Sequence, residues 1–133
     1  GVRYAGLGMP RPLFDQALVH PAIRDKIAAW GVDIVKEVQQ VVEAKDIVVV
    51  GMKMNPAPKK ARRLLDAAGL EYTYLEYGSY LSGYRRRLPL KLWTGWQTFP
   101  MVFVKGVLVG GASDLEKLMA SGKLDEMLKR DSK

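Results

Sequence analysis

Cysteine is missing from all 133 residues, and histidine occurs once, at His20. Without cysteine the chain has no disulfides, no thiolate metal ligands and no thiol redox chemistry of its own. A single histidine also excludes a site built from several histidines, so we expect no metal centre. The lack of disulfides fits a cytoplasmic protein, which is the location we expect.

Long apolar runs are missing as well. None approaches the ~20 residues that span a bilayer, and the start of the sequence has no basic-then-apolar segment typical of a signal peptide. We therefore expect no membrane association. Hydrophobic residues make up 48% of the chain, and this length suits one globular domain with a real core.

Positive charge is in excess, with a formal net charge of +7. Such an excess favours anionic partners, although a solvated basic surface is the simpler explanation. The run Arg85-Arg86-Arg87 lies near aromatic residues and invites a nucleic-acid interpretation. Three consecutive arginines on a helix point in three directions, however, so we expect no nucleic-acid binding. An anionic small peptide or protein segment is the partner that we expect.

Residues 1–45 are interpreted as an N-terminal arm with a helical extension. Glycine and proline are frequent in residues 1–13, which predicts a flexible or extended segment. A short helix is predicted from Pro21, because proline is tolerated in a first turn, and Gly31 is predicted to end it.

A second helix is predicted from a cap at Asp33 to about Glu43. Its apolar residues fall at helical spacing: Ile34, Val35, Val38, Val41 and Val42. This stripe packs on the following domain in one interpretation. In the other, the stripe and Trp30 form a surface for a partner or a second copy.

Residues 46–130 alternate between strand and helix patterns. The β-branched run 47–51 predicts a strand buried on both faces. After it we predict a helix over 56–68, a strand over 70–77, a helix over 79–93 broken by Gly83 and Pro89, strands over 101–104 and 107–109, a helix from 113 and a last one over 124–128. A helical crossover makes the first two strands parallel, and the Lys105-Gly106 turn adds an antiparallel hairpin. The fold class is therefore α/β, with a mixed four-stranded sheet flanked by helices.

Three motifs in this part resemble the glutaredoxin family. The segment 55–58, Asn-Pro-Ala-Pro, stands where a glutaredoxin carries Cys-Pro-Tyr-Cys. Thr98-Phe99-Pro100 is similar to the family's Thr-Phe-Pro motif, whose proline is cis, and residues 105–111 resemble its hairpin and glycine pair. Lys53 and Trp96 are similar to residues of the monothiol branch. The resemblance implies a thioredoxin-like fold, with residues 46–130 as a glutaredoxin-like domain.

The departure from the family lies at the two cysteine positions, Asn55 and Pro58. Thiol–disulfide exchange needs an attacking thiolate, and iron–sulfur clusters are normally held by thiolates, so we expect neither activity. Asn55 is instead an excellent helix cap with Pro56 at the first helical position. We still expect the helix N-terminus to offer partial positive charge and free N–H donors to an anion.

A ligand site for glutathione is implied by the resemblance. Lys53 and Arg87 would hold the glycine carboxylate, and the backbone of Phe99 would pair with the cysteine of the ligand. The turn after the glycine pair would hold the γ-glutamyl end, with Ser113 where the family usually has aspartate and Asp114 beside it. The candidate ligand-binding residues are Lys53, Asn55, Arg87, Thr98, Phe99, Pro100, Gly110, Gly111, Ser113 and Asp114.

Three hypotheses for the function stay open. The leading one is a redox-inactive binding module for glutathione or an acidic peptide or protein segment, which needs no cofactor. The second is a structural protein that dimerises through residues 14–45. The third is a glutathione-dependent enzyme that uses the thiol of its ligand, because a sulfur near a helix N-terminus can have a lowered pKa.

Overall fold

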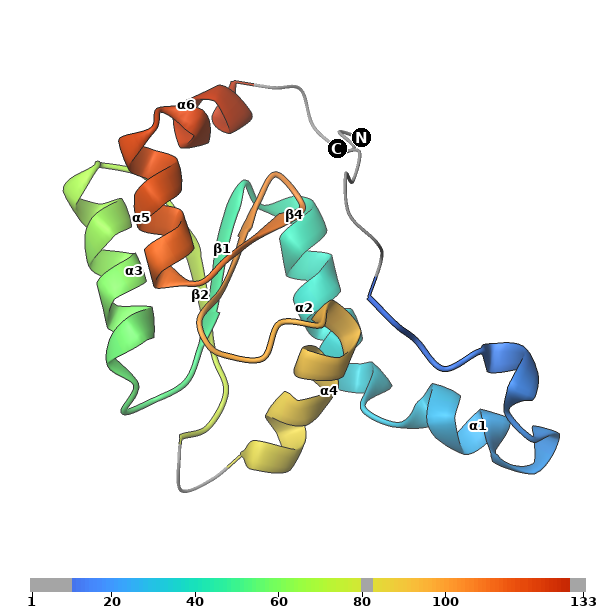
Figure 1. Ribbon diagram of the computed structural model, residues 1–133. Coiled ribbons are helices and arrows are strands. Elements are labelled where there is room, and N and C mark those ends of the chain that lie inside the picture. The colour runs from blue at the N-terminus through green and yellow to red at the C-terminus, as the bar shows by residue number, and fades with distance from the viewer. Residues whose placement is uncertain (1–10, 80–82, 130–133) are drawn as a thin grey trace.

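A mixed four-stranded sheet forms the centre of the computed structural model (Figure 1), which describes residues 11–79 and 83–129, residues 84–86 by their backbone only. The strands are β1 (Ile47–Gly51), β2 (Thr73–Glu76), β3 (Met101–Val104) and β4 (Val107–Gly110), in the order β2-β1-β3-β4. β1 runs parallel to β2 and antiparallel to β3, and β3 pairs antiparallel with β4. The predicted sheet is confirmed.

Helices cover both faces of this sheet. The structure contains the 3₁₀ turn η1 (Gln16–Leu18) and helices α1 (Pro21–Ala29), α2 (Val32–Ala44), α3 (Pro56–Ala67), α4 (Tyr84–Thr94), α5 (Ala112–Ala120) and α6 (Lys123–Leu128). α2 and α4 lie on one face, and α3, α5 and α6 lie on the other (Figure 1). This arrangement confirms the thioredoxin-like fold.

Strand β1 divides its side chains between two cores, which is why it is apolar throughout. Val48 and Val50 pack in the cluster with α2 and α4, whereas Ile47 and Val49 pack in the cluster with α3 and α5. All four side chains are at most 2% exposed. Burying each contributes about 1.5–3 kcal/mol to the free energy of unfolding, so the strand anchors the turn that follows it.

Helix α2 packs its apolar stripe into the domain. Ile34, Val38 and Val42 are buried in the same cluster as the sheet, so these residues of the stripe belong to the core. The predicted boundary after residue 45 therefore separates α2 from β1, and both of these elements pack in the same core. Asp33 was wrongly predicted as the cap: Gly31, with φ of 67°, occupies that position, and Asp33 lies in the first turn. Gly31 does end α1, as predicted.

Helix α4 is continuous, so the prediction of a break at Pro89 is wrong. Pro89 lies inside the helix and Gly83 caps its start. Proline removes one intrahelical hydrogen bond, but here its ring is buried against Gly31. A Cβ atom built on Gly31 would lie 2.3 Å from the Pro89 Cγ, so only glycine lets the two segments approach this closely.

Residues 11–30, which we call the arm, project from the domain. At the start of the arm, Arg11 Nη2 donates to the Leu92 carbonyl of α4 over 3.1 Å. Directly after the arm, Gly31 packs on Pro89 of α4. Helix α1 has no buried residue and lies apart from the sheet and its covering helices (Figure 1). The first ten residues of the predicted flexible segment lie outside the described residues.

Candidate functional site at the start of helix α3

A short turn carries the chain from β1 into α3. The Lys53 N–H donates to the Gly78 carbonyl over 2.7 Å, which ties the turn to the end of β2. Met54 then takes a left-handed backbone conformation, with φ of 64°, and is 66% exposed. The side chain of Lys53 is exposed beside it, so the turn presents one cation and one flexible apolar side chain to solvent.

Asn55 occupies the end of this turn and bonds in two directions. Its Oδ1 accepts a hydrogen bond from the Ala57 N–H over 3.1 Å, which confirms the predicted helix cap. Its Nδ2 donates to the Phe99 carbonyl over 3.3 Å. The side chain therefore joins the start of α3 to the loop that contains the cis peptide bond between Phe99 and Pro100. The predicted cis proline is confirmed.

The first turn of α3 has lost most of the donors that a helix N-terminus normally offers. Pro56 and Pro58 have no N–H, and the Ala57 N–H is engaged by Asn55. No free N–H remains at the first three helical positions, so the expectation of free donors there is wrong. The partial positive charge of the helix dipole persists, and the exposed Lys53 ammonium adds to it.

The glycine pair lies against the cis-proline loop. A Cβ atom on Gly111 would be 3.6 Å from the Pro100 carbonyl oxygen. The Gly111 N–H donates to Asp114 Oδ2 over 3.0 Å, and Gly110 has a φ of 114°, which favours glycine. The structure thus places Asp114 at the glycine pair and Asn55 at the cis-proline loop beside it. Thr98, Ser113 and Asp114 have exposed side chains, whereas Phe99 and Pro100 are buried.

Arg87 lies inside the domain. It is 5% exposed, and its Nη1 donates to the Tyr77 carbonyl over 3.1 Å. This guanidinium supports the connection between β2 and α4, where the Arg87 Nη1 would lie 3.3 Å from a Cβ atom on Gly83. The role of Arg87 toward a ligand carboxylate stays a prediction.

Lys91 lies near the site and was missed by the sequence interpretation, whereas Trp96 was noted only as part of a motif. The Lys91 ammonium lies 5.8 Å from the centroid of the Phe99 ring, where the π face attracts a cation. Lys91 follows Arg87 by four residues and shares its helix face, but the expected break at Pro89 hid this relation. Trp96 packs beside Gly111, and its buried indole N–H has no hydrogen-bond partner.

Tyr74 on β2 packs beside Gly51, where β1 ends and the turn begins. A Cβ atom on Gly51 would lie 2.9 Å from the Tyr74 hydroxyl oxygen and 2.8 Å from the Pro58 Cβ, so the three residues are packed tightly. The Arg62 guanidinium lies 4.1 Å above the Tyr74 ring. Burial, followed by the hydrogen bond that the hydroxyl donates to Glu76, raises the pKa of Tyr74 to about 12.

This raised pKa predicts a loss of stability in alkali. The folded chain holds the Tyr74 proton more tightly than the unfolded chain, whose pKa is near 10.0. The Tyr74 contribution to the free energy of unfolding is therefore complete below pH 10.0 and falls as the pH rises toward about 12. Denaturant unfolding across this window should show a smaller loss for Tyr74→Phe than for the wild type. Equal losses in the two proteins would contradict the assignment.

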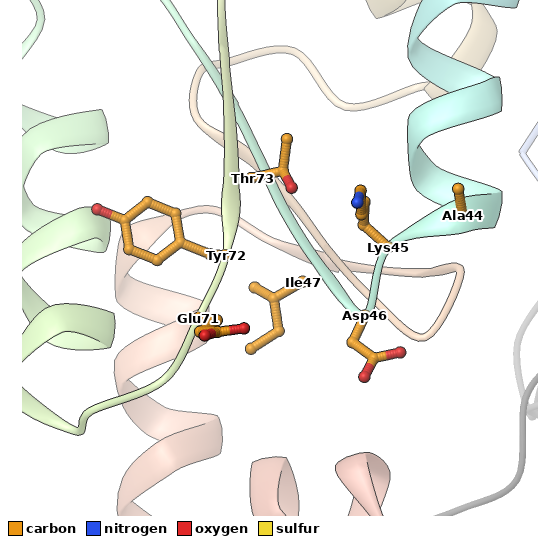
Figure 2. Close-up of a pocket in the computed structure, with 7 residues that line it drawn as sticks. All are labelled: Ala44, Lys45, Asp46, Ile47, Glu71, Tyr72 and Thr73. Atoms are coloured by element: carbon orange, nitrogen blue, oxygen red, sulfur yellow. The ribbon is translucent and has the colours of Figure 1, made fainter.

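A polar pocket lies where β1 and β2 begin, at the end of these strands away from the candidate site (Figure 2). It encloses about 320 Å³ between residues 44–47 and 71–73, with Tyr72 directed toward α3 and Lys45 on the side of α2. Asp46 at its rim pairs with Lys105 over 3.2 Å. Among residues 11–79 and 83–129, no three potential metal ligands gather, and no helix is long and apolar enough to cross a bilayer.

Comparison with known proteins places these features in a family. The Glutaredoxin family model matches residues 47–109. A glutaredoxin-like protein of Dictyostelium discoideum is 42% identical over 98 residues, which cover 74% of this chain and 80% of the relative. A probable monothiol glutaredoxin of Legionella pneumophila is 30% identical over 70 residues, covering 53% and 75%. The crystal structure of a buckwheat glutaredoxin–glutathione complex has a TM-score of 0.66 and 27% identity to this chain, covering 74% of this chain and 90% of that one.

The match spans β1, the start of α3, the cis-proline loop and most of the hairpin, and it ends just before the glycine pair and α5. Asn55 and Pro58 depart from the Cys-Pro-Tyr-Cys motif within this span, and no cysteine occurs elsewhere in the sequence. The similar solved structures nevertheless agree with the fold. This chain belongs to the glutaredoxin family.

Proposed function

We propose that the chain is a redox-inactive binding module, which holds glutathione or an acidic peptide segment on the surface between Lys53 and the start of α5. The observation that carries the proposal is the double hydrogen bond of Asn55, to Ala57 and to the Phe99 carbonyl. It holds the start of α3 on the cis-proline loop without a thiol. The similar buckwheat structure, a complex with glutathione, supports this choice of ligand.

Charges at the two ends of this surface fit the two ends of such a peptide. The exposed ammonium of Lys53 suits the glycine carboxylate, and Lys91 adds positive charge beside Phe99. At the far end the Asp114 carboxylate, one oxygen of which binds the Gly111 N–H, suits the amino group of the γ-glutamyl end. An extended peptide carrying a carboxylate at one end and an amine at the other therefore meets complementary charge.

The same geometry favours binding over thiol chemistry. A glutathione thiolate is stabilised at a helix N-terminus by free N–H donors and by positive charge. In this chain two of those donors are replaced by prolines and the third is engaged by Asn55. The sulfur of a bound ligand would gain little help in losing its proton, so we propose no transferase activity.

Titration followed by amide NMR tests the proposal. Glutathione should shift the signals of residues near Lys53, Phe99 and Ser113, with a Kd on the order of 1 mM, equivalent to about −4.1 kcal/mol. S-methylglutathione should bind equally well, because the site uses no thiol. Lys53→Glu should weaken both ligands about tenfold, because it replaces an attractive charge by a repulsive one.

Lys123→Glu is the matched control, since it makes the same change of charge on α6, at an exposed position outside the site. It should leave both affinities unchanged at constant ionic strength. Unshifted signals at millimolar glutathione, or equal weakening by the two substitutions, would refute the proposed site.

A further inference from the structure

A second surface, separate from the proposed binding site, consists of exposed apolar side chains. In the part of the chain that the structure describes, ten large apolar residues are at least 36% exposed, and all except Met54 belong to the arm, the start of α2 or the end of α4. The nine are Leu13, Phe14, Leu18, Ile23, Ile27, Trp30, Val32, Leu92 and Trp93. At roughly 100 Å² each they expose roughly 900 Å², which is close to the ~800 Å² that each partner buries in a standard interface.

Part of this surface is an apolar groove of about 340 Å³ between the arm and α4. Its walls come from α1 and its end (Ile27, Trp30), from α2 (Val32, Val35) and from α4 (Leu92, Trp93). The groove has fixed walls, because the Trp93 ring stacks on Phe103 with centroids 6.3 Å apart and Gly31 is packed on Pro89.

The arm also presents apolar side chains that its own chain leaves exposed. Phe14 is 68% exposed and Leu18 is 70% exposed. The turn that carries them is held in shape by Asp15, whose Oδ1 accepts from the Ala17 N–H, and by Gln16, whose Nε2 donates to the Phe14 carbonyl. Because the turn is already ordered, docking it would cost little conformational entropy.

Helix α1 adds an energetic reason for a partner. It has nine residues and none is buried. Isolated helices shorter than ~12–15 residues are marginal in water, so further apolar contacts would stabilise α1. Its exposed charges have both signs, as in Arg24, Asp25 and Lys26, which suits pairing with an identical helix better than with a partner of one sign.

We propose that two copies of this chain form a twofold dimer, in which the arm of each copy places Phe14 and Leu18 in the apolar groove of the other. A twofold axis lets one interface cover both the exposed arm and the groove of each copy. The lining of this groove is apolar, so the apolar side chains of Phe14 and Leu18 suit it better than charged side chains. The interface leaves Lys53 and Asn55 free, so dimerisation and ligand binding are independent.

Sedimentation velocity of the full chain tests the dimer. The wild type should be dimeric at submillimolar and dissociate at low micromolar concentration. Leu18→Glu in the arm and Leu92→Lys in the groove should each weaken the dimer at least about tenfold, because each buries a charge in an apolar contact. Both positions are exposed in one copy, so circular dichroism should show both variants folded.

Mixing the two variants distinguishes arm exchange from any other association. In the mixed dimer one arm–groove contact is wild type and the other pairs a carboxylate with an ammonium, so an equimolar mixture should recover the dimer.

Met54→Glu changes an exposed apolar residue outside the surface and should have no effect on the dimer. Higher salt should tighten the dimer, because it screens the repulsion between two chains of charge +7. A monomeric wild type, a mixture that stays monomeric, or weakening by salt would overturn the proposal.

Discussion

Asn55→Cys should convert a protein without thiols into one that forms a mixed disulfide with glutathione. The wild type has no cysteine, so its expected incorporation is zero. In the variant, the new thiolate attacks one sulfur of oxidised glutathione, an S–S bond to the protein forms, and one glutathione thiolate leaves. Intact mass spectrometry should therefore show one glutathione per chain, removed again by a reducing thiol.

The pKa of the new thiol should reveal what Pro58 does at this site. Loss of the Asn55 side chain frees the Ala57 N–H for the sulfur, and Lys53 adds positive charge, so the thiol pKa should fall below the usual value of about 8.5. Asn55→Cys with Pro58→Ala restores one more N–H, and its pKa should be about one unit lower again. That shift raises the thiolate fraction about tenfold, but the weaker nucleophile limits the gain in rate at neutral pH to about threefold.

Ser121→Cys is the control for this experiment. It places an exposed thiol between the end of α5 and the start of α6, where the two helix dipoles act in opposite directions on an anion. Its alkylation should follow a pKa of about 8.5. If the thiol introduced by Asn55→Cys titrates together with that of Ser121→Cys, the start of α3 supplies no useful positive potential. The loss of the Asn55 cap should also lower the stability by about 1 kcal/mol.

Gly31→Ala should be among the most destabilising single substitutions at an exposed or half-buried position. A left-handed backbone costs a residue with a Cβ about 1–2 kcal/mol, and the new atom would lie 2.3 Å from the Pro89 ring, which cannot rotate away. We expect a total loss of about 3 kcal/mol, or roughly 10 °C in Tm. Denaturant unfolding measures the free energy directly.

Gly69→Ala separates the two contributions. Gly69 has a φ of 69°, close to the 67° of Gly31, but nothing lies within 4 Å of the Cβ position. It should therefore lose only the backbone term of about 1–2 kcal/mol. Combining Gly31→Ala with Pro89→Ala should recover part of the loss, with an interaction energy above about 0.5 kcal/mol. Equal losses at Gly31 and Gly69 would show that the contact with Pro89 carries no strain.

Much of the fold could be predicted because local patterns decide it. The run from Ile47 to Val50 is buried on both faces, and the Lys105-Gly106 turn closes a hairpin, so the sheet follows from short segments. The continuous α4 could not be predicted in this way. The Pro89 ring packs on Gly31, which is far away in sequence, and a local pattern does not show this contact.

The candidate site was predictable in its motifs and not in its hydrogen bonds. Asn55 as a cap follows from residue preference, but its bond to the Phe99 carbonyl joins positions 44 residues apart. Arg87 is a second case. Its place in a motif does not show that its guanidinium is buried, and only the packed structure shows its bond to the Tyr77 carbonyl inside the domain.

The positions of the tryptophans give the molecule separate optical reporters. The chain has three, of which Trp30 and Trp93 line the apolar groove, whereas Trp96 packs beside Gly111 at the proposed binding site. Indole emission depends on local polarity, so association of two copies should change the first pair and a bound peptide the third. Variants that keep a single tryptophan would each follow one of the two events by fluorescence.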